Sequence, residues 1–338
     1  MNSKERVMAV INHEKPDYMP CFGANSTVTY EQMEAVQAFW PEGHLKGETM
    51  AKQALAAYSV LGFDAVRVPF CQTFEAVALG CNYKPGRGIE EGQEGIPGIE
   101  HPPPYTLDDS PEFPDDFLSR GNIPELIKAV RILKEEVGGK VPIVAGIIGP
   151  FTIAGALVDT VPLLKASFKT PLKMRPFLEV GQKAGHALAM AMVEAGADII
   201  SCEDMTASPD LIAPKTYKEY EMEYQRKQFE GIPVPKILHI CGNVDSIIEY
   251  MGETGAEILS LEPKASATLA RDKCGPDAVL MGGVDTATVL FLKDPETVRQ
   301  GCLEQIDTGI QILAPGCAVA PGTPKENLLA MVEVAKEH

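Results

Sequence analysis

The chain lacks any long hydrophobic run. None of its 338 residues lies in an apolar stretch that approaches the roughly 18 residues needed for a transmembrane helix. Its first residues, Met1 to Arg6, are typical of the start of an amphipathic helix and not of a signal peptide. We therefore expect a cytoplasmic protein that is neither exported nor inserted into a membrane.

Positive charge is also scarce. Thirty Lys and Arg residues face 47 Asp and Glu residues, which gives a formal net charge of -17. Nucleic acids and anionic membrane surfaces would be repelled by such a protein, so both are excluded as partners. The eight cysteines are scattered without the spacing of a secreted disulfide framework and are expected to be reduced thiols. Internal repeats and low-complexity tails are absent from the sequence.

What the sequence does contain is a series of short apolar runs that alternate with longer helical patterns. The eight predicted strands are Met19 to Ala24, Ala65 to Phe70, Pro142 to Ile148, Asp198 to Cys202, Ile237 to Cys241, Ile258 to Leu261, Ala278 to Gly282 and Gln311 to Ala314. Helical patterns follow most of them, although the one near residues 265–271 is weak. This alternation predicts an α/β protein, a (β/α)8 TIM barrel. We expect residues 1–338 to form one domain with an N-terminal helical extension.

One segment departs from this rhythm. Residues 83–121 are rich in proline, glycine and acidic residues, and they are too many for an ordinary connection between a strand and a helix. Because the segment follows the second predicted strand, it should lie over the carboxyl end of the barrel. It is interpreted as a lid or a partner-docking surface, or as an ordered excursion without function.

His239, Cys241 and Cys317 form a candidate metal site. His239 and Cys241 are two residues apart in a predicted buried strand, so their side chains point to the same face. Cys317 follows the last predicted strand. An imidazole and two thiolates form a ligand set that zinc prefers, and three protein ligands leave one coordination position open for chemistry. A structural zinc site or three unrelated buried residues are the alternatives; a structural site would normally have four ligands.

Several other polar residues follow predicted strands and would share the carboxyl rim of the barrel with this site. Glu262 is a candidate fourth zinc ligand that a thiol could displace. Asp204 is a candidate for orienting His239 or contacting substrate, and its neighbour Glu203 should point to the opposite face. Arg67 and Asp285 are candidate cofactor-binding residues. Each of the four carboxylates named here could instead be an ordinary charge on the rim of the barrel. For Arg67 a buried ion pair is the favoured alternative.

The sequence resembles the methylcobamide:coenzyme M methyltransferases of methanogenic archaea, a branch of the uroporphyrinogen decarboxylase superfamily. The motifs that carry the resemblance are Trp40-Pro-Glu-Gly-His44, Phe63-Asp-Ala-Val-Arg-Val-Pro-Phe70, Met192-Val-Glu-Ala-Gly-Ala-Asp198, Ala207-Ser-Pro-Asp-Leu211, Leu238-His-Ile-Cys-Gly242 and Leu313-Ala-Pro-Gly-Cys317. The resemblance implies a (β/α)8 fold with His239, Cys241 and Cys317 as catalytic zinc ligands. It also implies that Glu262 is a fourth ligand in the absence of a thiol.

The resemblance further implies a function. Zn²⁺ would activate the thiol of coenzyme M, a small thiol substrate, and a separate corrinoid protein would present methylcobamide as the methyl donor. The arginine-rich motif of the true decarboxylases is replaced here by Cys21-Phe-Gly-Ala-Asn-Ser26, which argues against decarboxylation. A different acceptor, such as homocysteine or tetrahydrofolate, and a non-catalytic, zinc-stabilised partner of a corrinoid protein remain open. The methyl source and the oligomeric state also remain open, and Arg67, Lys264 and Arg271 are candidate cations for the sulfonate.

Overall fold

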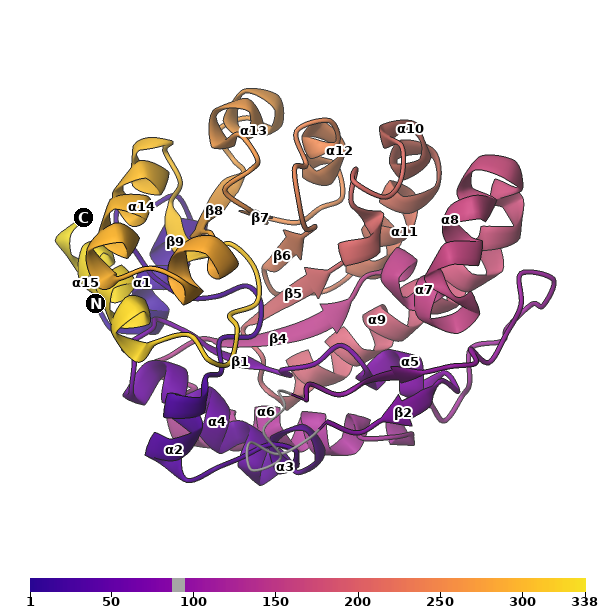
Figure 1. Cartoon of the computed structure of the whole chain (residues 1–338), viewed down its shortest axis with the longest axis horizontal. Coiled ribbons are helices and arrows are strands. Elements are labelled where there is room, and N and C mark those ends of the chain that lie inside the picture. Colours follow the sequence, from indigo (N-terminus) through magenta and orange to yellow (C-terminus); the bar gives the residue numbers. More distant parts are fainter. Residues whose placement is uncertain (87–94) are drawn as a thin grey trace.

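Seven parallel strands form one curled sheet in the computed structural model, which describes residues 1–86 and 95–338 (Figure 1). Around the sheet, each strand pairs in parallel with the next. The strands are β1 (Val66–Val68), β4 (Ile143–Ile148), β5 (Ile199–Glu203), β6 (Lys236–His239), β7 (Ile258–Leu261), β8 (Val279–Val284) and β9 (Ile312–Pro315). The predicted barrel is confirmed.

The first predicted strand occupies the remaining place in the ring, but as an isolated bridge. Cys21 pairs in parallel with Leu313 of β9, and Leu313 exchanges backbone hydrogen bonds with Pro20 and Phe22 at 3.0 and 3.1 Å. On the other side, the Asp64 amide donates to the Cys21 carbonyl, and the Asp64 carboxylate accepts from the Cys21 amide. A regular ladder does not form here because Pro20 has no N–H to donate and a side chain takes the place of a backbone acceptor.

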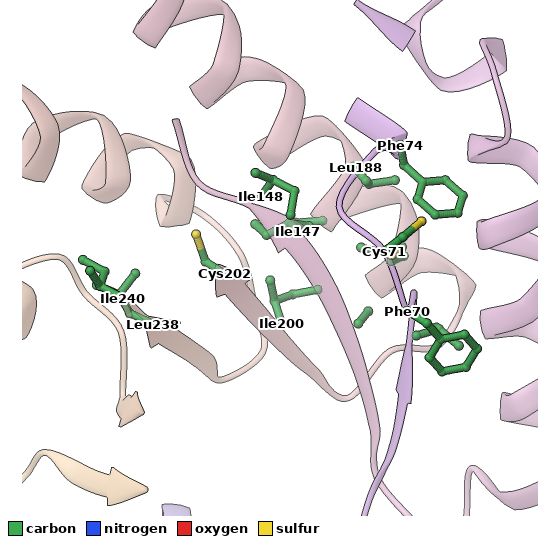
Figure 2. Packing of buried hydrophobic residues seen from close by; sticks show 14 of the residues in the cluster. Phe70, Cys71, Phe74, Ile147, Ile148, Leu188, Ile200, Cys202, Leu238 and Ile240 are labelled. Carbon is green, nitrogen blue, oxygen red and sulfur yellow. The ribbon is translucent and has the colours of Figure 1, made fainter. Parts of the chain in front are cut away.

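Helices cover the outside of the sheet. Figure 2 shows the apolar layer between them, in which Ile147 and Ile200 of the sheet and Leu188 of α9 are buried together. The covering helices are α4 (Gly47–Ser59), α6 (Ile123–Val137), α9 (Arg175–Ala195), α11 (Met222–Phe229), α12 (Ile248–Gly252), α13 (Ala267–Cys274), α14 (Pro295–Asp307) and α15 (Lys325–Glu337). The weakly predicted helix near residues 265–271 is thus present as α13.

The alternation of side chains along the strands determines what faces the barrel interior. A buried cluster inside the barrel contains Val144, Ile199, Ile237 and Ile258 from four neighbouring strands, together with Val7 of α1 (Ser3–Ile11). Because side chains alternate with a period of two, the residues two positions further along also face inward. The next inward residues therefore include Ser201, His239 and Ser260, which stand between this apolar layer and the carboxyl end of the barrel.

The remaining helical elements lie at the carboxyl end of the barrel and in the loops. They are α2 (Tyr30–Val36), α3 (Glu42–Leu45), α5 (Phe74–Ala78), η2 (Phe117–Ser119), α7 (Pro150–Val158), α8 (Thr160–Lys169), η3 (Pro171–Met174), η4 (Met205–Ala207), α10 (Pro214–Thr216), η5 (Tyr217–Glu221) and η6 (Thr286–Phe291). Across the described residues, no single helix is long and apolar enough to cross a membrane. The pair α7 and α8 has the length and composition together but is bent by 111°. Cytoplasmic localisation stays a prediction.

The long segment of residues 83–121 is built around a small hairpin. Strand β2 (Asn82–Lys84) pairs antiparallel with β3 (Gly98–Glu100), and residues 87–94 between them lie outside the described residues. Residues 96–99 of this segment line the cavity beside the candidate metal site. The predicted position over the carboxyl end of the barrel is therefore confirmed for these residues, while the lid and docking roles stay predictions.

Candidate functional site

Four potential metal ligands meet at the carboxyl end of the barrel. His239 ends β6, Cys241 follows it by two residues, Glu262 follows β7 and Cys317 follows β9. One ligand atom from each of these residues lies within 4.8 Å of all the others. The Cys241 Sγ lies 3.5 Å from His239 Nε2 and 3.8 Å from the Cys317 Sγ. Three separate strand ends thus bring together the four residues that the sequence predicted.

The ring of His239 is held by the neighbouring strand. His239 pairs in register with Ser260 of β7, and its Nδ1 lies 3.0 Å from the Ser260 Oγ. Both side chains are buried, so this hydrogen bond is shielded from water. In the tautomer whose Nδ1 donates to Ser260, Nε2 would offer its lone pair to a metal ion bound by the two cysteines. A metal-ligating histidine usually has such a partner on its second nitrogen.

The imidazole and the two thiols of the cluster shift one another's pKa values. Hydrogen bonding from Cys241, and then from His239, lowers the pKa of the Cys317 thiol, although burial opposes this change. The pKa of Cys241 is raised by its hydrogen bond to Cys317 and by burial. Burial alone would lower the pKa of His239, but the hydrogen bond to Cys317 and nearby negative charges raise it. The three side chains therefore compete for protons, and a divalent cation bound between them would displace those protons.

The donor set fits zinc. Imidazole nitrogen, two thiolate sulfurs and one carboxylate oxygen are all established zinc ligands, and four of them suffice for a tetrahedral site. Cys241, Glu262 and Cys317 are each partly exposed, whereas His239 is buried. A small molecule can therefore approach this cluster from one side, as the open coordination position of a catalytic zinc requires.

A cavity of about 310 Å³ opens beside the cluster. Its described lining residues are Asn25, Ser26, Trp40, Arg67, Phe70, Cys71, Gln72, Thr73, residues 96–99, Glu203, Met205, His239, Cys241, Cys317, Ala318 and Val319. Apolar and neutral polar side chains dominate this set, with one Arg and one Glu. Such a cavity suits a small molecule whose reactive group reaches the candidate metal ligands.

Arg67 and Glu203 form a buried ion pair on the cavity wall. The Arg67 Nη2 donates to Glu203, whose other oxygen accepts from the Gln72 amide. The Arg67 Nε donates to the Ala24 carbonyl at 2.9 Å, and Nη1 donates to the Pro69 carbonyl. The alternative of a buried ion pair at Arg67 is confirmed.

Asp204 lies elsewhere than its proposed role requires. Its carboxylate accepts from the Thr152 backbone and hydroxyl at 2.8 Å each, and from the Gln225 amide at 2.9 Å. The structure therefore ties it to the first turn of α7 and to α11, while the recorded partner of the His239 ring is Ser260. The alternation along β5 is the physical reason: with Ile199 and Ser201 inward, Glu203 faces the cavity and Asp204 faces the helices.

The remaining predicted residues lie outside the cavity wall. Asp285 caps η6, because its side chain accepts from the amides of Ala287 and Thr288. Burial alone would raise the pKa of Asp285, but these hydrogen bonds together lower it. Arg271 donates to three carbonyls at the end of α13, those of residues 275, 276 and 278. Lys264 is also absent from the described lining of the cavity.

Three residues at the site were not predicted from the sequence. Ser260 could have been found, because it lies in the predicted strand two residues after Ile258 and two before Glu262, and residues spaced by two point to the same face. Glu203 could have been assigned by extending the alternation from Ile199. Trp40 belongs to a motif that marked the family resemblance, but its place on the cavity wall carries no periodic signal in the sequence.

A family model for uroporphyrinogen decarboxylase (URO-D) matches residues 2–338. A methylcobamide:CoM methyltransferase, MtaA of Methanosarcina barkeri, is 36% identical over 336 residues, covering 99% of this chain and 98% of the relative. A second methylcobamide:CoM methyltransferase, MtbA of Methanosarcina acetivorans, is 34% identical over 339 residues with the same coverage of both chains. The resemblance noted from the sequence motifs is thus confirmed over the full length.

A solved structure shows the same similarity in three dimensions. It is described as a methyltransferase from Methanosarcina mazei and superimposes with a TM-score of 0.92 at 36% sequence identity. The match covers 100% of this chain and 99% of the other. The two chains therefore share the same barrel fold.

Proposed function

Since this chain belongs to the uroporphyrinogen decarboxylase family and is a methyltransferase by its close relatives, we propose that it transfers a methyl group from a protein-bound methylcobamide to the thiol of coenzyme M, with zinc as its cofactor. The observation that carries the proposal is the cluster of His239, Cys241, Glu262 and Cys317 beside a small cavity. A ligand set of this kind suits a metal that activates a thiol.

The residues of the cluster would hold the metal in distinct ways. His239, Cys241 and Cys317 are the permanent ligands, with Ser260 orienting the imidazole through Nδ1. Glu262 supplies a carboxylate that an incoming thiol can replace. When bound, zinc lowers the pKa of a thiol that joins its ligands, so that the thiolate forms at neutral pH. Glu262 or solvent then accepts the thiol proton.

The methyl transfer itself balances without a further reactant. The thiolate sulfur attacks the methyl carbon of a methyl-Co(III) corrinoid. A carbon–sulfur bond forms as the cobalt–carbon bond breaks, and the bonding electron pair remains on cobalt as Co(I). The cavity wall contributes the apolar side chains of Phe70, Met205 and Val319, which would disfavour water beside the reacting groups.

The same cavity argues against tetrapyrrole decarboxylation. Among the described residues that line it, Arg67 is the one Lys or Arg, and its charge is matched by Glu203. Asn25 and Ser26, which end the segment that replaces the arginine-rich motif of the decarboxylases, are neutral. A substrate with many carboxylates would find few cations here.

The methyl donor would be presented by a separate corrinoid protein at the carboxyl end of the barrel. Residues 96–99 of the long 83–121 segment border the cavity there. The names of both relatives include methylcobamide, which supports a corrinoid as the methyl donor.

The test is a panel of methyl acceptors. Zinc-loaded protein is incubated with methylcobalamin and coenzyme M, homocysteine or tetrahydrofolate, and demethylation is followed optically. We expect turnover with coenzyme M that is lost in Cys241→Ala and Cys317→Ala. Turnover with another acceptor and none with coenzyme M would contradict the proposed acceptor. Unfolding of both cysteine variants would instead indicate a structural zinc.

A further inference from the structure

None of the sequence-based candidates for binding the sulfonate of coenzyme M is a free cation on the cavity wall, since Lys264 and Arg271 are not among the described residues that line it. Arg271 donates to carbonyls that end α13. Arg67 is buried against Glu203, and its Nε and Nη1 donate to the backbone. Releasing Arg67 would leave the Glu203 charge buried and unpaired, which is strongly unfavourable. The anionic end of the substrate therefore needs another set of donors.

Two neutral side chains on the cavity wall have unused hydrogen-bonding groups. The indole of Trp40 is 4% exposed, and its Nε1 is buried without a hydrogen-bond partner among the described residues. Asn25 is 3% exposed, and its Oδ1 also lacks a partner in the same part of the chain. Rotation of the Asn25 amide exchanges its oxygen with its NH₂ group, so Asn25 can also present a donor. Unsatisfied buried polar groups are rare and need an explanation.

The surroundings of Trp40 hold its ring in place without adding charge. The imidazole of His44 lies against the indole with ring centroids 4.7 Å apart, and Phe70 contacts His44 edge-on. Burial lowers the pKa of His44 to about 3, so the imidazole is neutral. Gly43 leaves room for the Gln53 side chain, which donates to the Ala38 carbonyl at 3.0 Å. This loop therefore fixes Trp40 as a rigid part of the cavity wall.

Building on the proposed function, we propose that Trp40 Nε1 and the Asn25 amide bind the sulfonate of coenzyme M while its thiol reaches the candidate metal ligands. Both residues line the cavity that also contains His239, Cys241 and Cys317. Neutral N–H donors bind anions well where water is excluded, because hydrogen bonds to a charged group are stronger than those between neutral groups. Trp40 and Asn25 are thus positioning residues that select an anionic thiol.

The test compares two thiols that differ at one end. Coenzyme M carries a sulfonate, whereas 2-mercaptoethanol carries an uncharged hydroxyl on the same two-carbon thiol. For Trp40→Phe and Asn25→Asp, we expect the KM for coenzyme M to rise at least about tenfold, as for the loss of a hydrogen bond to a charged group. The kcat for coenzyme M and both constants for 2-mercaptoethanol should change by less than about twofold.

Two further variants serve as controls. Met205→Leu alters the same cavity without removing a donor and should affect both thiols by the same factor. Arg67→Lys should also affect both thiols equally, because it disturbs the Glu203 pair and not the sulfonate. Selective loss of coenzyme M in Arg67→Lys, or equal loss of both thiols in Trp40→Phe and Asn25→Asp, would overturn the assignment.

Calorimetric binding of coenzyme M to zinc-loaded wild type and Trp40→Phe separates this inference from the proposed function. If wild type binds coenzyme M at least about tenfold more tightly than Trp40→Phe but does not methylate it, the sulfonate site stands and the proposed function fails. Equal affinity in both proteins overturns the sulfonate site whether or not turnover occurs. Circular dichroism verifies that each variant is folded, and Asn25→Asp provides the same comparison if Trp40→Phe is not.

Discussion

The hydrogen bond between His239 and Ser260 makes the zinc affinity of the site testable by one small substitution. Replacing Ser260 with alanine removes the partner of His239 Nδ1 at 3.0 Å and leaves that N–H buried. Loss of such a supporting partner typically lowers metal affinity by about 10- to 100-fold. This factor corresponds to about 1.4–2.8 kcal/mol, which agrees with the roughly 1–3 kcal/mol cost of an unsatisfied buried donor.

Ser201→Ala is the matched control for Ser260→Ala. Ser201 is equally buried on another strand of the same barrel and donates its hydroxyl to the Ala24 carbonyl at 2.9 Å, away from His239. Zinc affinity is measured for wild type and both variants by competition with a chromophoric chelator, with melting temperatures alongside. We expect only Ser260→Ala to lose zinc affinity. Equal affinities in the two variants would refute the orienting role of Ser260.

Three other substitutions probe stability and ligation. Burial raises the pKa of Glu75 from 4.5 to about 7, so the folded state holds a proton that the unfolded state loses, and stability falls as pH rises from about 4.5 to 7. Glu75→Gln should therefore raise the free energy of unfolding by up to about 3 kcal/mol at pH 8 but not at pH 4, as measured by urea denaturation; an equal effect at both would contradict this. Asp64→Ala should lower the free energy of unfolding by about 3 kcal/mol in the same assay, because it removes a buried partner of Arg6 and of the Cys21 amide. A change below about 1 kcal/mol would contradict that role of Asp64. Glu262→Gln should still bind one zinc per chain by metal analysis, whereas loss comparable to that in Cys241→Ala would show that Glu262 is a permanent ligand.

Much of the barrel and of the cluster of candidate metal ligands could be predicted because both depend on strong local signals. Buried parallel strands appear as short apolar runs, and their alternation places His239 and Cys241 on one face. Since carboxyl ends of the strands meet at one end of the barrel, Cys317 and Glu262 could be added from distant parts of the sequence. Even the imperfect first strand was found, although Pro20 limits it to a bridge.

Other features depend on side-chain directions and partners that local sequence patterns do not predict. The predicted strand before Asp204 ends at Cys202, whereas β5 continues to Glu203, whose side chain faces the cavity. Arg67 had several conceivable partners, and only the fold brings Glu203 against it. Trp40 and Asn25 come from irregular segments, where no period predicts which way a side chain points. Tertiary packing decides these positions.

The most direct measurement of the central claim is a single-turnover reaction between methylcobalamin and coenzyme M in the presence of zinc-loaded protein. Methyl-coenzyme M is quantified against the loss of methylcobalamin, with Cys317→Ala as the control. We predict one methyl-coenzyme M formed for each methylcobalamin consumed in wild type and none above background in the variant. Methylcobalamin that stays intact with wild type and coenzyme M, or equal product in Cys317→Ala, would contradict the account.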